Sequence, residues 1–225
     1  MKIIEKLSGI ITIIIIAFGF TACGGDDVNT SVPHTHNNWD WVAYTTGSGL
    51  RECQTDGCTI TAGVGDTGSA DGIIFFAAAS GFTVTGIGSF TAYYLEAAPT
   101  NQETNITWSS ANIDVTGAEG TAIGTGKANT AAIITAFSGD TTLNNAAIAA
   151  SEYTGGEKND WFLPSKDELN EIYKAKRYFG ISSGGFWSSS QVNDNNAWNQ
   201  YFSSGNQHNK FGKNILNNVR AARAF

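Results

Sequence analysis

A short apolar run near the N-terminus decides which part of the chain is expected to fold as a globular protein. Lys2 and Lys6 form a basic head, and residues 10–20 are apolar apart from Thr12 and Gly19. A run of about eleven residues is too short to cross a bilayer as a helix, which needs about 20, but it fits the apolar middle of a secretory signal peptide. We therefore expect residues 1–22 to be a signal peptide.

Small residues followed by a cysteine end this run. Phe20-Thr21-Ala22-Cys23 resembles a bacterial lipobox, in which the cysteine sulfur is acylated and the signal peptide is then removed. Lipidation of Cys23 provides more than one acyl chain, which is enough for stable attachment to a membrane. The alternative is an ordinary signal peptide in which the cysteine has no role. Residues 23–33 predict an acidic flexible tether. The predicted location is the bacterial cell envelope, at the outer membrane or the cell surface.

The charge of the chain argues against one class of partner. The formal net charge is −7, and removal of residues 1–22 leaves 11 basic and 19 acidic side chains. An acidic protein repels phosphate backbones, and no basic stripe is interleaved with aromatic residues, so nucleic acid is not an expected partner. The 26 glycines and six tryptophans are typical of a loop-rich fold held together by aromatic side chains.

Two further cysteines lie close together in a segment that contains histidine and tryptophan. Cys53 and Cys58 predict a disulfide that closes a small loop in an oxidising compartment. The alternative is a zinc site formed with His34 and His36, although these histidines are closer together than the usual zinc-binding pair. Apolar and polar residues alternate in this segment, so residues 34–62 predict a small β-hairpin module.

The region after this module combines patterns of strands and helices. Continuous apolar runs at residues 72–79 and 90–99 predict two buried strands joined as a hairpin. Apolar residues at helical spacing predict helices over residues 129–137 and 143–153, with Asn129 or a neighbour capping the first.

The stretch from Asn159 to Tyr173, NDWFLPSKDELNEIY, predicts the start of another helix. Ser165 and Glu168 have the spacing of a capping box, in which the serine oxygen accepts from a helix N–H and the glutamate accepts from the serine N–H. Asp167 also lies where the helix dipole favours negative charge. No base, nucleophile or histidine lies near these acids, so we expect them to form the helix start and not a catalytic acid–base pair.

Four motifs follow one another in the C-terminal part of the chain: NDWFLPSKDEL at 159–169, GGFWSSSQ at 184–191, AWNQYFSSGNQ at 197–207 and NVRAARAF at 218–225. In this order they resemble the Lcl C-terminal domain family, a group of exported bacterial domains named for a collagen-like adhesin. The resemblance covers residues 71–225. Asn159 stands where the family usually has glycine, and the last motif lacks the cysteine that is common between the two arginines.

The resemblance implies an α+β, C-type-lectin-like domain with short antiparallel strands and two to three helices, preceded here by the small β-hairpin module. The fold is distantly related to formylglycine-generating enzymes, which depend on paired cysteines; the chain has no cysteine after Cys58, so their activity is not expected. Arg220 and Arg223 are expected to pair with acids such as Asp160 or Glu168. Seven motif residues are expected to be structural: Trp161, Pro164, Ser165, Glu168, Trp187, Arg220 and Arg223.

The stretch between Gln191 and Lys213 is the candidate binding surface because it is rich in amide and aromatic side chains. Amides both donate and accept hydrogen bonds and aromatic rings stack on sugars, so the stretch predicts a glycan or extracellular-matrix ligand. Its Asn and Asp oxygens also make calcium the one cofactor considered, although one carboxylate is a poor site. The alternative is that Trp198 packs inward. The candidate ligand-binding residues are Asn193, Asp194, Asn196, Trp198, Gln200, Tyr201, Gln207 and His208.

Together these patterns predict a lipid-anchored envelope protein that binds a ligand or adheres to a surface and is not an enzyme. One alternative is a structural envelope lipoprotein without a soluble ligand. An enzyme is the least favoured class, because the sequence contains no recognisable nucleophile–base pair, metal cluster or cofactor loop.

Overall fold

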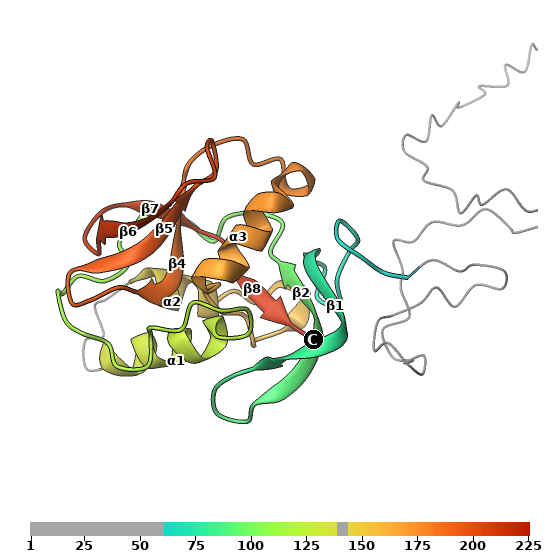
Figure 1. Cartoon of the computed structure of the whole chain (residues 1–225), viewed down its shortest axis with the longest axis horizontal. Helices are drawn as coiled ribbons and strands as arrows, with labels where there is room; N and C mark the ends of the chain where they lie inside the picture. Colours follow the sequence, from blue (N-terminus) through green and yellow to red (C-terminus); the bar gives the residue numbers. More distant parts are fainter. Residues whose placement is uncertain (1–60, 139–143) are drawn as a thin grey trace, which may run out of the picture.

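The computed structural model describes residues 61–138 and 144–225. The predicted signal peptide, Cys23, the tether and the possible disulfide or zinc residues Cys53, Cys58, His34 and His36 lie outside the described residues, as does nearly all of the predicted hairpin module. Within the described ranges the chain forms an α+β domain of three α-helices and two sheets, which confirms the α+β part of the predicted fold class (Figure 1).

Eight strands and three α-helices make up this domain. The strands are β1 (Ile73–Val84), β2 (Phe90–Ala97), β3 (Glu103–Ile106), β4 (Gly185–Gln191), β5 (Asn196–Tyr201), β6 (Gln207–Gly212), β7 (Asn217–Val219) and β8 (Ala222–Ala224). The helices are α1 (Gly126–Ala136), α2 (Ala146–Ser151) and α3 (Lys166–Lys174), with short 3-10 turns η1 (Gly155–Glu157) and η2 (Lys176–Phe179). None of the helices in the described ranges is long and apolar enough to span a bilayer.

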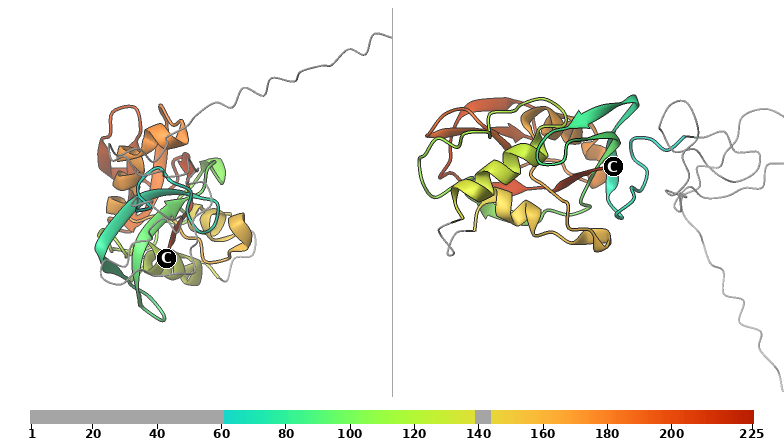
Figure 2. Two further views of the ribbon diagram at one scale, coloured as in Figure 1. Left: turned by 90° about the vertical axis from the view of Figure 1, so that its right-hand side faces the viewer. Right: turned by 90° about the horizontal axis from the view of Figure 1, so that it is seen from below.

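The strands form a three-stranded sheet in the order β1-β2-β8 and a five-stranded sheet in the order β3-β7-β4-β5-β6. The expectation of antiparallel strands holds for every named pair except β4 and β7, which run parallel. The expectation of short strands is wrong for β1, which has 12 residues. A register shift between Ala77 and Phe82 lets β1 continue to Val84 beside β2. The predicted hairpin therefore extends beyond the rest of the domain (Figures 1 and 2).

The helix starts differ from the predictions in one informative way. Helix α1 begins at Gly126, and Asn129 does not cap it: the buried side chain donates instead to the carbonyl of Gly120 and to Ser189 Oγ on β4. By contrast, Asn145 does cap α2, because its side-chain oxygen accepts from the N–H groups of Ala147 and Ile148.

Two apolar clusters hold the sheets and helices together. One lies against α1 and α2 and contains the buried Trp108 and Trp187, whose indole N–H groups donate to the carbonyls of Ser188 and Ile106, both at 2.9 Å. The other lies beneath α3 and contains Phe186. Residues 217–224 pass from β7 in the larger sheet to β8 in the smaller one, so the last motif links the two sheets.

Candidate functional site

The predicted binding stretch forms the β5–β6 hairpin and the turn before it. Across the strands, Asn199 lies opposite both Trp187 and His208, while Gln200 lies opposite both Phe186 and Gln207. Successive side chains of a strand point to opposite faces, so the candidate residues are divided between the two faces of the sheet.

The face toward α3 uses its amides for packing. Gln200 is fully buried, and its side-chain nitrogen donates to Asn170 Oδ1 at 2.9 Å and to the carbonyl of Gly205 at 3.1 Å. Gln207 donates to the carbonyl of Lys166 at 2.8 Å. Trp198 is half-buried, with the Lys166 ammonium 5.2 Å from its ring centroid. Both glutamines therefore attach the hairpin to α3. The expectation that Gln200 contacts a ligand is corrected because the side chain is fully buried, whereas the half-buried Gln207 stays a predicted ligand contact.

The asparagine-rich turn is held by its own side chains. Asn193 Oδ1 accepts from the backbone N–H groups of Asn195 and Asn196, each at 2.9 Å. Asp194 Oδ1 accepts from the Asn195 amide at 2.6 Å. Over residues 61–138 and 144–225, no group of three or more His, Cys, Asp or Glu side chains is placed to hold a metal ion. Asn193 Oδ1 and Asp194 Oδ1 are thus used by hydrogen bonds within the turn, and calcium binding by these oxygens stays a prediction.

Three rings gather on the opposite face, and we call Tyr201, His208 and Phe211 the aromatic face. The centroid of Tyr201 lies 5.3 Å from that of His208 and 5.9 Å from that of Phe211, both edge-on, and all three side chains are half-buried. Phe211 in turn packs edge-on against the buried Trp187 at 5.7 Å. The aromatic face therefore has a rigid base in the core.

Asn199 lies on the same face and is the residue that the sequence analysis missed. It is 1 % exposed, and neither its amide nitrogen nor its amide oxygen has a hydrogen-bond partner among the described residues. An unsatisfied buried polar group costs about 1–3 kcal/mol, so Asn199 is a locally destabilising group beneath the aromatic face. Strand alternation places Asn199 on the same face as Tyr201. The β5–β6 register, which pairs Phe211 with Ala197, is needed to place Phe211 on that face too.

Lys213 is a second buried group that the sequence did not indicate. Its ammonium donates to the carbonyl of Ile113 at 2.7 Å and to Gln191 Oε1 at 3.0 Å, and lies 4.4 Å from the centroid of Trp108. Burial lowers the pKa of Lys213 to about 8, against the opposing effect of Asp114 and Asp194. The side chain ties the end of β4 to the 107–115 segment, which gives it a structural role.

The capping box at the start of α3 is confirmed. Ser165 Oγ accepts from the N–H of Glu168 at 3.3 Å, and Glu168 Oε2 accepts from the N–H of Ser165 at 2.7 Å. Glu168 is also fully buried, and its Oε1 accepts from the N–H of Gly124 at 2.8 Å, so one carboxyl group joins α3 to the turn before α1. Burial raises the pKa of Glu168 to about 7, although the backbone donors oppose the shift.

This raised pKa predicts a pH-dependent stability. The folded protein binds the Glu168 proton more tightly than the unfolded chain does. The contribution of this proton to the free energy of unfolding is therefore complete below about pH 4.5 and is lost as the pH rises to about 7. We expect the free energy of unfolding of wild type, relative to Glu168→Gln, to fall by about 2 kcal/mol between pH 5 and pH 7.5. Urea unfolding of both proteins at the two pH values measures it; an unchanged difference would contradict the shift.

Arg223 pairs with two acids, as the sequence analysis predicted in part. Its Nε donates to Asp160 Oδ1 at 2.6 Å and its Nη1 to Glu96 Oε1 at 2.9 Å. Glu96 is fully buried, and its Oε2 also accepts from the N–H groups of Ala70 and Gly72. Burial raises the pKa of Glu96, while Arg223 and the backbone donors oppose this. The network joins β8, β2 and the segment before β1.

Arg220 differs from its predicted pairing. No carboxylate of the described residues lies within ion-pair distance; its guanidinium donates to the carbonyl of Ala98 at 2.7 Å and to Asn101 Oδ1 at 2.6 Å. Asp160 is taken by Arg223, and Glu168 is held by backbone N–H groups. The prediction that Arg220 pairs with Asp160 or Glu168 is therefore wrong.

The other motif residues expected to be structural lie in the interior. Trp161 donates to the carbonyl of Gly155 at 3.1 Å and packs edge-on against Tyr153, with centroids 4.9 Å apart. Trp187 is fully buried. Pro164 is buried too, and its carbonyl accepts from the N–H of Ser189 at 2.8 Å, which connects the start of α3 to β4.

Comparison with known proteins does not add to this description. No protein-family model matches the chain, and no curated protein matches it either. The resemblance to the Lcl C-terminal domain family therefore stays a prediction from the four motifs.

Proposed function

We propose that this protein is an exported, lipid-anchored module of the bacterial envelope that binds a glycan through its aromatic face and has no catalytic activity. The apolar run followed by Cys23 supports export and anchoring. The four ordered motifs and the α+β arrangement support a C-type-lectin-like domain of the Lcl C-terminal family.

The grouping of Tyr201, His208 and Phe211 is the observation that carries the glycan proposal. Half-buried rings present apolar surface next to polar edges, the combination on which the C–H face of a sugar stacks. His208 adds a ring nitrogen at the edge of the same surface. The extracellular-matrix ligands predicted from the sequence are included in this proposal if they carry glycans.

Binding to glycans tests this proposal. We expect the full-length chain, purified in detergent, to bind at least one glycan saturably, and Tyr201→Ala to lower that affinity about tenfold or more because it removes the central ring. A glycan array followed by titration calorimetry measures both. Calcium chelation should leave the affinity unchanged, since the described residues form no cluster of acids for the ion.

Tyr178→Ala is the matched control, because Tyr178 is an exposed tyrosine on η2 outside the aromatic face. It should bind as wild type does. The absence of binding to every glycan by a folded protein, or equal losses in Tyr178→Ala and Tyr201→Ala, would reject the aromatic face as the site and favour the structural envelope lipoprotein.

A further inference from the structure

A groove of about 390 Å³ lies at the link between the two sheets, and none of its lining residues belongs to the aromatic face. Its walls come from residues 99–101 after β2, from residues 179–183 after α3, and from β4 and the β7–β8 link. Phe179, Ile181 and Phe186 supply apolar surface, while Ser182 and Ser183 supply hydroxyl groups at the exposed rim. The size and mixed lining are those of a small-molecule site, for which about 300–1,000 Å³ is typical.

Arg220 is the single charged residue among the described residues that line this groove. The side chain is 3 % exposed, and its Nε has no hydrogen-bond partner among the described residues. Among the described residues, one N–H of each terminal nitrogen has a protein acceptor: Ala98 O for Nη1 and Asn101 Oδ1 for Nη2. Since a guanidinium has five N–H donors, three are left for another acceptor.

A buried positive charge without a partner is costly, and the described part of the fold gives no compensating anion. The nearest aromatic contact is Phe179, whose ring centroid lies 5.4 Å from the guanidinium carbon and whose attraction is modest. Burial lowers the pKa of Arg220 to about 10, the direction expected for a cation that lacks an anion. Arg223, three residues away, forms ion pairs with two carboxylates. Among the described residues, the missing carboxylate partner is therefore a feature of Arg220 and not of both arginines in this motif.

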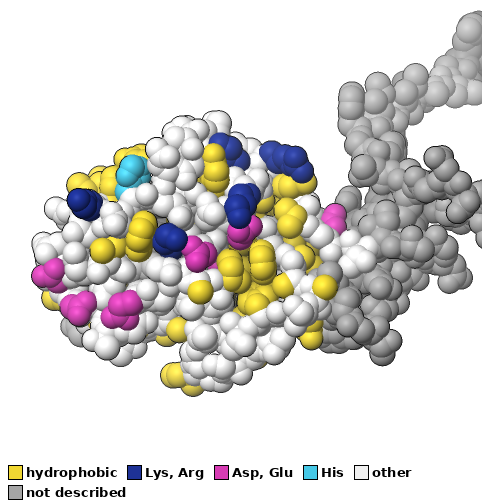
Figure 3. All heavy atoms as spheres, viewed as in Figure 1, with side chains coloured by type: hydrophobic (Ala, Val, Ile, Leu, Met, Phe, Trp, Pro, Cys, Tyr) yellow, Lys and Arg dark blue, Asp and Glu magenta, His cyan; other side chains and the backbone are white. Residues whose placement is uncertain are grey.

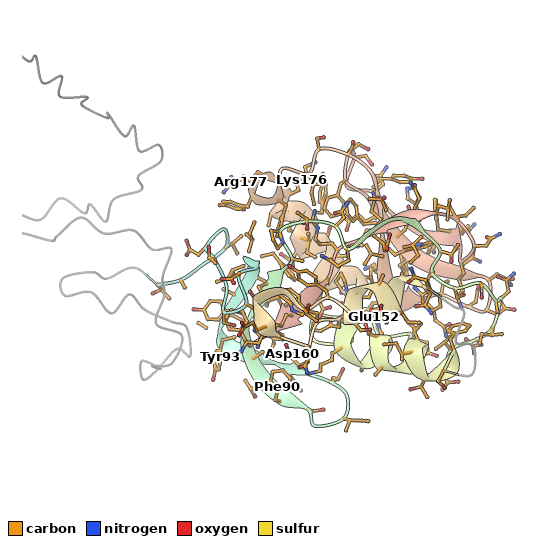
Figure 4. The ribbon with its side chains drawn as sticks, turned by 180° about the vertical axis from the view of Figure 1, so that it is seen from behind. Phe90, Tyr93, Glu152, Asp160, Lys176 and Arg177 are labelled. Carbon is orange, nitrogen blue, oxygen red and sulfur yellow. The ribbon has the colours of Figure 1, made fainter. Side chains whose placement is uncertain are left out.

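The surroundings of the groove favour a negative ligand further. Lys176 and Arg177 lie on η2, immediately before the wall formed by residues 179–183, and Figure 4 shows them well separated from the acids Glu152 and Asp160. In Figure 3 two groups of lysine and arginine side chains lie near the upper edge of the face, and others lie beside acidic side chains. Lys176 and Arg177 therefore place positive charge close to the groove in a protein that is acidic as a whole.

We propose that the groove binds a carboxylate with an apolar body, with the carboxylate paired to Arg220 and the apolar body against Phe179, Ile181 and Phe186. A carboxylate carries one negative charge and matches a single guanidinium through paired N–H···O bonds, whereas a phosphate dianion would leave charge unmatched. A free small acid and the C-terminus of a peptide share this chemistry.

Titration of the full-length chain with paired probes tests the proposal. We expect N-acetyl-leucine to bind saturably and N-acetyl-leucinamide, which lacks the charge, to bind at least about tenfold more weakly. A pentapeptide that ends in leucine, with a free or an amidated C-terminus, distinguishes peptide C-termini from small acids as ligands. If the peptide with the free C-terminus binds more tightly than N-acetyl-leucine, the groove is assigned to peptide C-termini. If it binds more weakly, the groove is assigned to small acids. Equal binding of acid and amide, or equal competition by inorganic phosphate, would overturn the proposal.

Ser183→Asp is the informative variant, because it places a carboxylate at the exposed rim without disturbing the core. It should lower the affinity for N-acetyl-leucine about tenfold or more, because the new carboxylate pairs with Arg220 itself or repels the carboxylate of the ligand. Ser110→Asp, an equally exposed change outside the groove, should not. Tyr201→Ala should also retain acid binding, so failure here is distinguishable from failure of the glycan proposal. Unchanged affinity in Ser183→Asp would place the acid elsewhere and overturn the assignment.

Discussion

Glu168→Ala is expected to lower the free energy of unfolding by about 3–5 kcal/mol at pH 6. The carboxyl group accepts from the N–H groups of Ser165 and Gly124 in a fully buried position. Alanine leaves both donors without an acceptor and removes half of the capping box, and each buried unsatisfied donor costs about 1–3 kcal/mol. Urea unfolding followed by circular dichroism measures the loss.

Asp167→Ala is the control, since Asp167 lies in the same first turn and its side chain is 44 % exposed. It pairs with Lys166 at the surface, so the loss should stay below about 1 kcal/mol. Similar losses for Asp167→Ala and Glu168→Ala would show that the helix dipole, and not the buried hydrogen bonds, sets the effect.

Arg223→Met is expected to lower the free energy of unfolding by about 3–5 kcal/mol at pH 7, because it leaves the carboxyl group of Glu96 buried without its cation. Methionine retains much of the volume of the arginine stem, so the loss reports the charge and not a cavity. Chemical unfolding with tryptophan fluorescence measures it. Arg177→Met, at an exposed arginine on η2, should change stability by less than about 1 kcal/mol.

The double variant Glu96→Gln/Arg223→Met separates charge burial from packing. Replacing Glu96 by glutamine removes the buried charge, while the amide oxygen of the new side chain can still accept from the N–H groups of Ala70 and Gly72 as the Glu96 oxygen does. The double variant should be more stable than Arg223→Met alone, a positive coupling in a double-mutant cycle. Additive losses would mean that Glu96 and Arg223 do not stabilise the fold as a pair.

Local patterns predicted the elements whose cause is local. The capping box of Ser165 and Glu168 needs only residues three apart, and the strand β2 needs only its own apolar run, so both were readable from the chain. Asn129 was misread because a residue that suits a helix cap suits a buried amide equally well; β4, sixty residues away, supplies the partner that decides between them.

The candidate site shows the same division. Composition identified the amide- and aromatic-rich stretch, and it named Tyr201 and His208 together with Gln200 and Gln207. Which of these face inward depends on the pairing of β5 with β4 and β6 and on where α3 packs. Both faces of this hairpin carry polar and aromatic side chains, so composition does not show which face is buried. Only the packed domain distinguishes the aromatic face from the buried amides.

The amino-acid sequence by itself determined the strand β2, the start of α3 and the residues from which a binding surface can be made, because hydrophobic periodicity and capping act over a few residues; the α+β class came from the resemblance of the four motifs. The tertiary structure alone decided which charges are compensated. Arg223 meets Asp160 and Glu96, whereas Arg220, in the same motif, meets only a carbonyl and an amide among the described residues. Electrostatic pairing depends on the distance between groups that lie far apart in the chain, and that distance is set only when the sheets pack.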